Sequence, residues 1–439
     1  MKNVVNTTRR TVALAAAALT ASALALTACS SGSPASAPQA DQASDSLEVM
    51  SWWTSGSEHA ALQVLYNAVT AAHSNVTVTD GAVAGGAGAN VAVALANRLQ
   101  AGDPPDVWQT FVGAPTKAYA NAGQTADVSS VYSQTGLGSA LPQNILDAVT
   151  VNGKQYGVPT GAHRGNVLWF STAALQKAGI TTPGAGYTFD TFLADLGKAK
   201  SAGVVPLCLG AKDNFTSVEL FENNLLSVVG EQGWTDIGND RFDWNGQQAS
   251  TALQRFGQVL DYADPESGAL TWDAAAQKLA KGQCAFASMN DSFDGELLAA
   301  GAHDGTDFGA VPYPGTESVF TAVIDTFVLS SQTANGQNGL AFLTAAADPT
   351  TTLEFNRIKG SVPVRTDVDV ASLSGYQQQA AQALRSQTVL MSIAHGELGG
   401  SRFQEGVYDG VAAYKTSRDQ RSFVSALETA VAGAPVLKP

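Results

Sequence analysis

The sequence predicts an α/β protein in which helices cover a largely parallel β-sheet. The length, the composition and an alternation of short apolar strands with amphipathic helices support this fold class. The chain has 439 residues, enough for two domains of ordinary size. Hydrophobic residues make up 45% and charged residues 14%, a balance that builds large apolar cores and excludes a largely disordered chain.

The alternation is clearest in the first quarter of the chain. Leu62, Leu65 and Val69 recur at helical spacing on one face, which is typical of an amphipathic helix. Strand, helix, strand, helix and strand in succession predict a parallel sheet, and such sheets bind ligands beyond the carboxyl ends of their strands. The expected strands cover residues 47–52, 76–78 and 106–111, and the expected helices cover 58–73 and 91–99.

A second α/β unit is expected to follow. Thr188 is expected to cap a helix, because a threonine hydroxyl can accept a hydrogen bond from a free N–H of the first turn. The tail over residues 375–432 is expected to be mostly helical. The expected strands cover residues 156–160, 166–170, 204–209, 284–289, 307–312 and 320–329, and the helices cover 188–202, 215–229, 246–262 and 336–347.

The first 29 residues are expected to direct export. Lys2, Arg9 and Arg10 precede a run without charge, and the run ends in Leu-Thr-Ala-Cys29, which resembles the lipobox of bacterial lipoproteins. This resemblance implies that residues 1–28 form a signal peptide, that Cys29 is lipidated, and that residues 29–46 form a flexible tether. A transmembrane helix is the alternative, and both Sec and twin-arginine export remain open.

The charge balance and the absent motifs exclude several classes of protein. With 38 acidic and 24 basic residues the formal charge is −14, so nucleic acid is not expected as a partner. The sequence has no P-loop, no G-x-S-x-G elbow and no complete dinucleotide fingerprint. The five histidines are scattered, so neither a metal nor a cofactor is expected. Outside the cytosol Cys208 and Cys284 could form a disulfide or remain as free thiols, and sequence alone leaves this open.

Seven short stretches, taken together and in this order, resemble one family. They are similar to the extracellular solute-binding lipoproteins of carbohydrate ABC transporters, in the cluster that includes maltose-binding protein and closest to its glucose/mannose-binding branch. The stretches lie at residues 51–56, 85–88, 101–109, 157–170, 324–327, 359–361 and 394–396.

The resemblance implies a two-lobed periplasmic-binding-protein-like fold, the Venus flytrap, with the ligand in the cleft. Three crossings between the lobes are expected near Pro159, Pro312 and Val362, and Arg164 is expected to brace the first one through carbonyl or carboxylate groups. Lobe one then covers residues 47–158 and 313–361, and lobe two covers 159–312 and 362–439.

A sugar site needs an aromatic plate for the apolar face of the pyranose and planar polar groups for its hydroxyls. Trp52 and Trp53 could supply the plate, and since adjacent strand residues face opposite ways, both cannot enter one core. Glu58 could instead stabilise a helix start, and His163 could be structural. The predicted sugar-binding residues are Trp52, Trp53, Glu58, Gln109, His163, Asp291, Asp325, Lys359 and His395.

Two positions depart from the glucose/mannose branch. Phe111 stands where that branch tends to have a histidine, and Ser292 stands where it has a tryptophan. One polar contact and one stacking plate are therefore expected to differ. Losing a hydroxyl partner costs about 1–3 kcal/mol, which is enough to change the preferred sugar.

The sequence thus predicts a monomeric, non-catalytic receptor on the extracellular face of the cytoplasmic membrane, held there only by its lipid. It is expected to bind a mono- or small oligosaccharide, glucose-like in the first instance, and to deliver it to permease subunits that work with a separate ATPase. The alternatives are a lipid-anchored extracellular glycoside hydrolase and a sugar-sensing lipoprotein.

Overall fold

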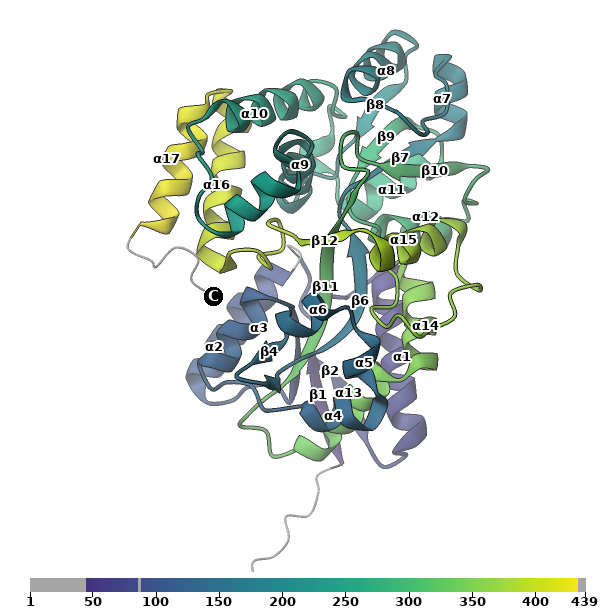
Figure 1. Cartoon of the computed structure of the whole chain (residues 1–439). Helices are drawn as coiled ribbons and strands as arrows, with labels where there is room; N and C mark the ends of the chain where they lie inside the picture. The colour runs from purple at the N-terminus through teal and green to yellow at the C-terminus, as the bar shows by residue number, and fades with distance from the viewer. Residues whose placement is uncertain (1–44, 86–87, 433–439) are drawn as a thin grey trace, which may run out of the picture. The chain divides into compact units, whose positions relative to one another are not determined.

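The computed structural model describes residues 45–85 and 88–432, which form helices packed on two β-sheets (Figure 1). The predicted signal peptide, Cys29 and the tether up to residue 44 lie outside the described residues.

The first sheet has six strands, in the order β12-β11-β3-β1-β2, with β6 also paired to β11. β1 is parallel to β2 and β3, as the sequence predicts. β11 runs antiparallel to β3 and β6, so the sheet is mixed. The strands are β1 (Ser46–Met50), β2 (Thr77–Asp80), β3 (Val107–Phe111), β6 (Val158–Arg164), β11 (Val319–Leu329) and β12 (Thr388–Met391).

The second sheet has four strands, in the order β10-β7-β9-β8. They are β7 (Val167–Ser171), β8 (Val205–Cys208), β9 (Cys284–Ser288) and β10 (Phe308–Pro312). A disulfide joins Cys208 to Cys284, with their Cα atoms 5.8 Å apart. The sequence left open whether these cysteines form a disulfide or remain as free thiols, and the structure has the disulfide.

Helices cover both sheets, and their apolar faces form the cores. Leu62, Leu65 and Val69 of α1 are fully buried, and α1 packs against α13 and α14 (Figure 1). The Thr188 side chain accepts a hydrogen bond from the N–H of Thr191, so the predicted cap is confirmed. The helices of the first half are α1 (Gly56–Ala72), α2 (Ala89–Ala101), α3 (Ala114–Asn121), α4 (Ser129–Thr135), α5 (Leu137–Ala140), α6 (Gln143–Ala148), α7 (Thr172–Ala178) and α8 (Phe189–Ser201).

The part of the chain that follows β8 contains the remaining helices and is mostly helical after β11. Its helices are α9 (Phe215–Gly238), α10 (Gln247–Leu260), α11 (Trp272–Ala280), α12 (Ser292–Ala299), α13 (Gly336–Ala347), α14 (Pro349–Lys359), α15 (Gly375–Ser386), α16 (Gly400–Ser417) and α17 (Gln420–Val431). A short hairpin, β4 (Thr150–Val151) and β5 (Lys154–Gln155), and a 3-10 turn at Ser267–Ala269 complete the described elements. α16 packs on α17, and both lie near α9 and α10 (Figure 1).

The chain passes from one sheet to the other in the segments between β6 and β7 and between β10 and β11. β6 reaches Arg164, so the first change of sheet falls a few residues beyond Pro159. Val362 forms an isolated bridge with Ala162 of β6. The Arg164 guanidinium donates to the carbonyl of Val319 at 3.1 Å and so ties β6 to the start of β11, the bracing role that the sequence predicts.

No helix among the described residues is both long and apolar enough to traverse a lipid bilayer.

Candidate functional site

A cavity of about 200 Å³ lies where segments from both sheets meet. Part of its wall is formed by segments that directly follow β1, β2, β9 and β12, the position at which α/β sheets bind ligands. It is lined by Trp52, Thr54, Ser55, Gly56, Glu58, Ala84, Gly85, Phe111, His163, Asp213, Phe215, Thr271, Trp272, Asp273, Met289, Asn290, Ser292, Glu296, Val323, Asp325, Lys359 and His395.

Six of the nine residues predicted to bind sugar line this cavity. They are Trp52, Glu58, His163, Asp325, Lys359 and His395. Trp53, Gln109 and Asp291 do not line it, and all three are buried.

Trp53 belongs to the core, where its ring packs between Phe327 and Phe355 with centroid distances of 5.7 and 5.5 Å. Trp52 is half-buried and faces the cavity. The alternation of side chains along an extended segment explains this split, because one indole of the pair must point away from the other.

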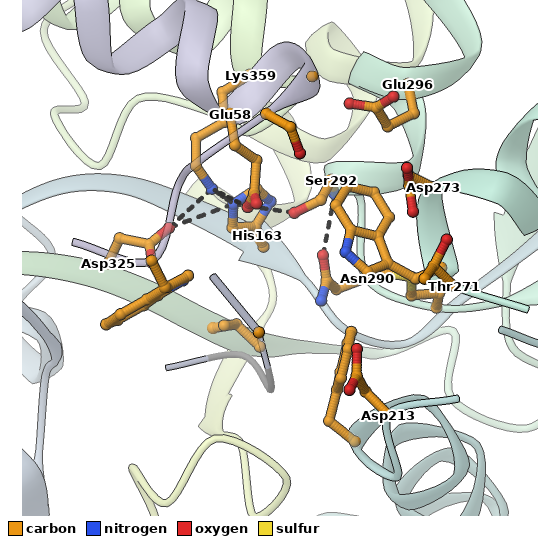
Figure 2. Close-up of a pocket in the computed structure, with 18 of the residues that line it drawn as sticks. Glu58, His163, Asp213, Thr271, Asp273, Asn290, Ser292, Glu296, Asp325 and Lys359 are labelled. Carbon is orange, nitrogen blue, oxygen red and sulfur yellow. Dashed lines mark hydrogen bonds and ion pairs between the residues drawn. The ribbon is translucent and has the colours of Figure 1, made fainter. Parts of the chain in front are cut away.

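Lys359 is the centre of a buried polar cluster (Figure 2). Its ammonium group donates to Asp325 Oδ2 at 2.9 Å and lies 3.6 Å from Glu58 Oε1. It also hydrogen-bonds His163 Nε2 and lies 4.6 Å from the ring centre of Trp53. The cation is thus held by carboxylates, an imidazole and an indole face, with only 1% of its side chain exposed.

The end of α14 places Lys359 at this point. Gly360 follows with φ 90°, in the left-handed region that ends helices at glycine. A Cβ at this position would also collide with the backbone of Gly295 in α12. Glycine therefore both ends the helix and lets α14 approach α12.

Asp325 is held as an ion. Burial alone would raise its pKa, but Lys359 and His163 outweigh burial and hold the pKa of Asp325 well below its usual range. Gln109 donates to the other carboxylate oxygen, Oδ1, at 2.9 Å. Gln109 therefore orients Asp325 from behind the cavity wall. A register shift in the β6–β11 pairing falls between Asp325 and Thr326, where such irregularities re-aim side chains.

Asp291 orients His163 in the same way. Its Oδ1 lies 2.6 Å from His163 Nδ1, and its Oδ2 accepts from the backbone N–H of Arg164 and from the hydroxyl of Tyr376. Burial and the Lys359 ammonium would lower the pKa of His163, but the carboxylates of Asp291 and Asp325 outweigh them and raise it. Asp291 is thus a support for His163 and does not line the cavity.

Aromatic side chains form one wall. The rings of Trp52 and Phe111 have centroids 4.9 Å apart, and Phe111 meets His395 edge-on at 5.1 Å. Phe111 thus contributes apolar surface at the position where the resemblance would place a histidine. Ser292 lines the cavity with its hydroxyl 3.5 Å from His163 Nε2, so this position supplies no plate.

Sequence reasoning missed a second tryptophan and an acidic rim. Trp272 begins α11 and lines the cavity, with Asp273 next to it. Figure 2 shows Asp213, Asp273 and Glu296 across the cavity from the Lys359 cluster. The sequence offered little indication of these carboxylates. Asp213 precedes α9 and Asp273 lies in the first turn of α11, and acidic residues are common at helix starts for reasons unrelated to ligands.

Glu296 of α12 links the two sides of the cavity. Its Oε1 accepts from both the backbone N–H and the hydroxyl of Ser57 in α1, at 2.8 and 2.9 Å. The carboxylates of Asp213 and Asp273 have no hydrogen-bond or ion-pair partner within residues 45–85 and 88–432.

His395 is a neutral member of the wall. Burial lowers its pKa to about 3. Behind it lie two buried carboxyl groups of α9: Glu219 Oε1 is 3.6 Å from His395 Nε2, and Glu222 accepts from the segment that carries the histidine. Burial raises the pKa of Glu219 to about 8 and that of Glu222 to about 7.

The donor set offers no metal site. In the described part of the chain no three His, Cys, Asp or Glu side chains are placed to hold a metal ion.

Known proteins of one family are similar to this chain. The family model described as "Bacterial extracellular solute-binding protein" matches residues 53–352. An uncharacterised ABC transporter extracellular-binding protein of Pyrococcus horikoshii is 30% identical, with 89% of each chain covered. A probable sugar-binding periplasmic protein of Mesorhizobium japonicum is 32% identical over 73% of this chain and 76% of its own.

Solved structures show the same fold. The bacterial solute receptor AcbH, described with an exclusive preference for β-D-galactopyranose, superimposes with a TM-score of 0.76 at 15% identity, over 88% of this chain and 97% of its own. The α/β fold is therefore the two-lobed one that the sequence predicts. The family consists of receptors and not of enzymes, which removes the glycoside hydrolase alternative. This chain belongs to the bacterial extracellular solute-binding proteins.

Proposed function

We propose that this receptor binds a neutral mono- or small oligosaccharide, glucose-like in the first instance, and delivers it to the permease of an ABC importer. The observation that carries the proposal is the pairing, in one cavity, of the Trp52 indole with the fixed polar groups of Lys359, Asp325 and His163. An indole covers the apolar face of a pyranose, and fixed donors and acceptors bind the hydroxyls at its edge. Relatives named as sugar-binding proteins support the same ligand class.

The charges of the wall favour a ligand without a negative charge. Glu58, Asp213, Asp273 and Glu296 line the cavity together with Asp325, and Lys359 is the one lysine or arginine among the described lining residues. That cation already pairs with Asp325 at 2.9 Å. A carboxylate or phosphate on the ligand would therefore meet a net repulsion in a partly desolvated site.

The ligand is best identified by thermal shift with neutral sugars and matched acids. D-glucose, D-galactose, D-mannose, D-xylose and maltose form the panel, and D-glucuronate differs from D-glucose only by the carboxylate at C6. A sugar at 100 times its dissociation constant adds about 2.7 kcal/mol to the free energy of unfolding. We expect at least one neutral sugar to raise the melting temperature and D-glucuronate to bind at least tenfold more weakly than D-glucose. A melting temperature that no sugar of the panel moves would contradict the proposal.

The two adjacent tryptophans provide a matched pair of variants. Trp52→Leu removes the half-buried plate that faces the cavity, so we expect about a tenfold loss of sugar affinity and a smaller change in stability than for Trp53, since stacking contributes about 0.5–1.5 kcal/mol beyond the area it buries. Trp53→Leu leaves a cavity in the core, so we expect a loss of about 2 kcal/mol or more in the free energy of unfolding. Calorimetric titration and urea denaturation measure the two effects. Equal losses of affinity in both variants, with stability unchanged, would contradict this assignment.

We further propose the division into lobes that the sequence predicts, 47–158 with 313–361 and 159–312 with 362–439. The two sheets support it, except that residues 159–164 and β12 pair within the first sheet. Sugar binding would close the lobes, because contacts from both sides of the cavity are complete only when the lobes meet. We also propose that the receptor is a monomer and that a lipid on Cys29 anchors it to the outer face of the membrane. Both parts of this proposal rest on the sequence alone.

A further inference from the structure

We propose that Glu222, acting through the hydroxyl of Ser392, sets which nitrogen of His395 carries the proton, so that Nε2 presents a hydrogen-bond acceptor to the ligand. Glu222 is thus a positioning residue and does not itself line the cavity. The inference deepens the proposed function and rests on it for the role of the ligand, whereas the position of the proton can be measured without one.

The first step is the hold of Glu222 on the segment before His395. Glu222 lies on α9, is 3% exposed, and accepts three hydrogen bonds. Its Oε2 accepts from the Ser392 hydroxyl and from the Ala394 N–H, both at 3.0 Å, and its Oε1 accepts from the Ile393 N–H at 3.2 Å. At pH 7.5, above the raised pKa of about 7, the Glu222 carboxyl is mostly ionised and accepts in all three contacts.

The second step is the direction of the Ser392 hydroxyl. A hydroxyl has a single hydrogen, and that of Ser392 is given to Glu222. Toward His395 the Ser392 oxygen can therefore only accept. It lies 3.3 Å from the His395 backbone N and 3.2 Å from Nδ1.

The third step is the imidazole itself. With a pKa lowered to about 3 by burial, His395 is neutral and carries one N–H and one bare nitrogen. Because Nδ1 must donate to Ser392, the bare nitrogen is Nε2. The hydrogen bond made by one ring nitrogen thus decides the role of the other, as in metal-binding histidines with a carboxylate behind them.

The surroundings of Nε2 agree with an acceptor there. The nearest carboxyl, Glu219 Oε1, lies 3.6 Å away. Burial raises the pKa of Glu219 to about 8, so at pH 7.5 this carboxyl is mostly protonated and does not oppose the lone pair. The edge of Phe111 covers another side of the ring, which leaves Nε2 to a hydroxyl of the ligand.

Glu222→Gln and Glu397→Gln form a matched pair. Glutamine at 222 keeps the shape but brings an N–H₂ group to Ser392 or to the backbone, so Ser392 can turn its hydrogen toward His395 Nδ1. Glu397 is equally buried and holds the same segment, accepting from the Ile324 and Ser392 N–H groups. It does not contact the Ser392 hydroxyl, so its variant perturbs the segment without reversing that hydrogen.

The test is nitrogen NMR of histidine-labelled protein at pH 7.5 without ligand, with His395→Gln to assign the signal. We expect the Nδ1–H form in the wild type and in Glu397→Gln, and a shift toward Nε2–H in Glu222→Gln and in Ser392→Ala. An Nε2–H form in the wild type would overturn the proposal, even if no variant folds. Unchanged nitrogen signals in both Glu222→Gln and Ser392→Ala would also overturn it.

Affinity for the sugar probe tests the consequence. With D-glucose as probe we expect Glu222→Gln to bind about tenfold more weakly, and to cause no further loss in a His395→Gln background. Additive losses would show that Glu222 acts by another route and would overturn the coupling to His395. If no sugar binds the wild type, the proposed function is wrong. The NMR experiment uses no ligand, so it still tests the position of the proton on His395.

Discussion

Lys359→Met is expected to lower the free energy of unfolding by about 3–5 kcal/mol and to abolish sugar binding. Removing one partner of a buried ion pair leaves the other charge without compensation. Asp325 is 2% exposed, and Lys359 is its partner at 2.9 Å. Methionine preserves the length and apolar stem of the side chain, so the loss reports the charge and not the packing. Urea denaturation measures it.

The control for this variant removes the stranded charge as well. In Lys359→Met/Asp325→Asn the carboxylate of Asp325 is no longer left alone, so we expect this double variant to recover at least half of the lost stability and none of the binding. A double variant as unstable as Lys359→Met plus the separate cost of Asp325→Asn would show that the two residues do not act as a pair.

Glu219→Gln is expected to remove a large dependence of stability on pH. In the folded protein burial raises the pKa of Glu219 to about 8, while its ordinary value is 4.5. Between these values the folded state holds a proton that the unfolded state releases. Stability from this group is therefore complete below about pH 4.5 and is lost as the pH rises toward 8, by roughly 1.4 kcal/mol per unit.

Denaturation of wild type and variant at half-unit intervals from pH 5 to 8.5 tests this. Glutamine resembles the protonated acid and cannot ionise, so the wild type should lose stability relative to Glu219→Gln across the window. Glu222, with a pKa raised to about 7, titrates in both proteins, and its charge is one of the causes that raise the pKa of Glu219. Parallel curves would mean that Glu219 is already ionised in the folded state.

The regular elements were predictable because their signals are local. Apolar residues at helical spacing indicated α1, and α13 begins and ends where the sequence predicts. The short helices α3 to α6 were missed because segments of four to eight residues show too few turns for a period to be read. β12 was missed inside a tail expected to be helical, since its four residues become a strand only by pairing with β11.

The residues that meet at the candidate site are far apart in the sequence, so only the resemblance, and not their spacing, could group them. Asp325 and Lys359 are 34 residues apart, and no local rule brings them to 2.9 Å. Trp272 and Asp213 carried no motif, so only the three-dimensional arrangement reveals them. Gln109 and Asp291 belong to the site but act one layer behind it, a distinction that depends on side-chain direction and lies beyond sequence reasoning.

The pairing of β3 with β11 has a consequence for how the chain acquires its fold. Phe111 lies opposite Asp325, so about 200 residues must be made after β3 before its neighbour exists. At roughly 5–20 residues per second this takes about 10–40 s. Throughout that delay the apolar flank of β3 has no partner strand, and pairing across so long a stretch is itself slow. Nascent or translocating chains should therefore remain vulnerable to aggregation until β11 emerges, and a chaperone that shields β3 would act in that interval.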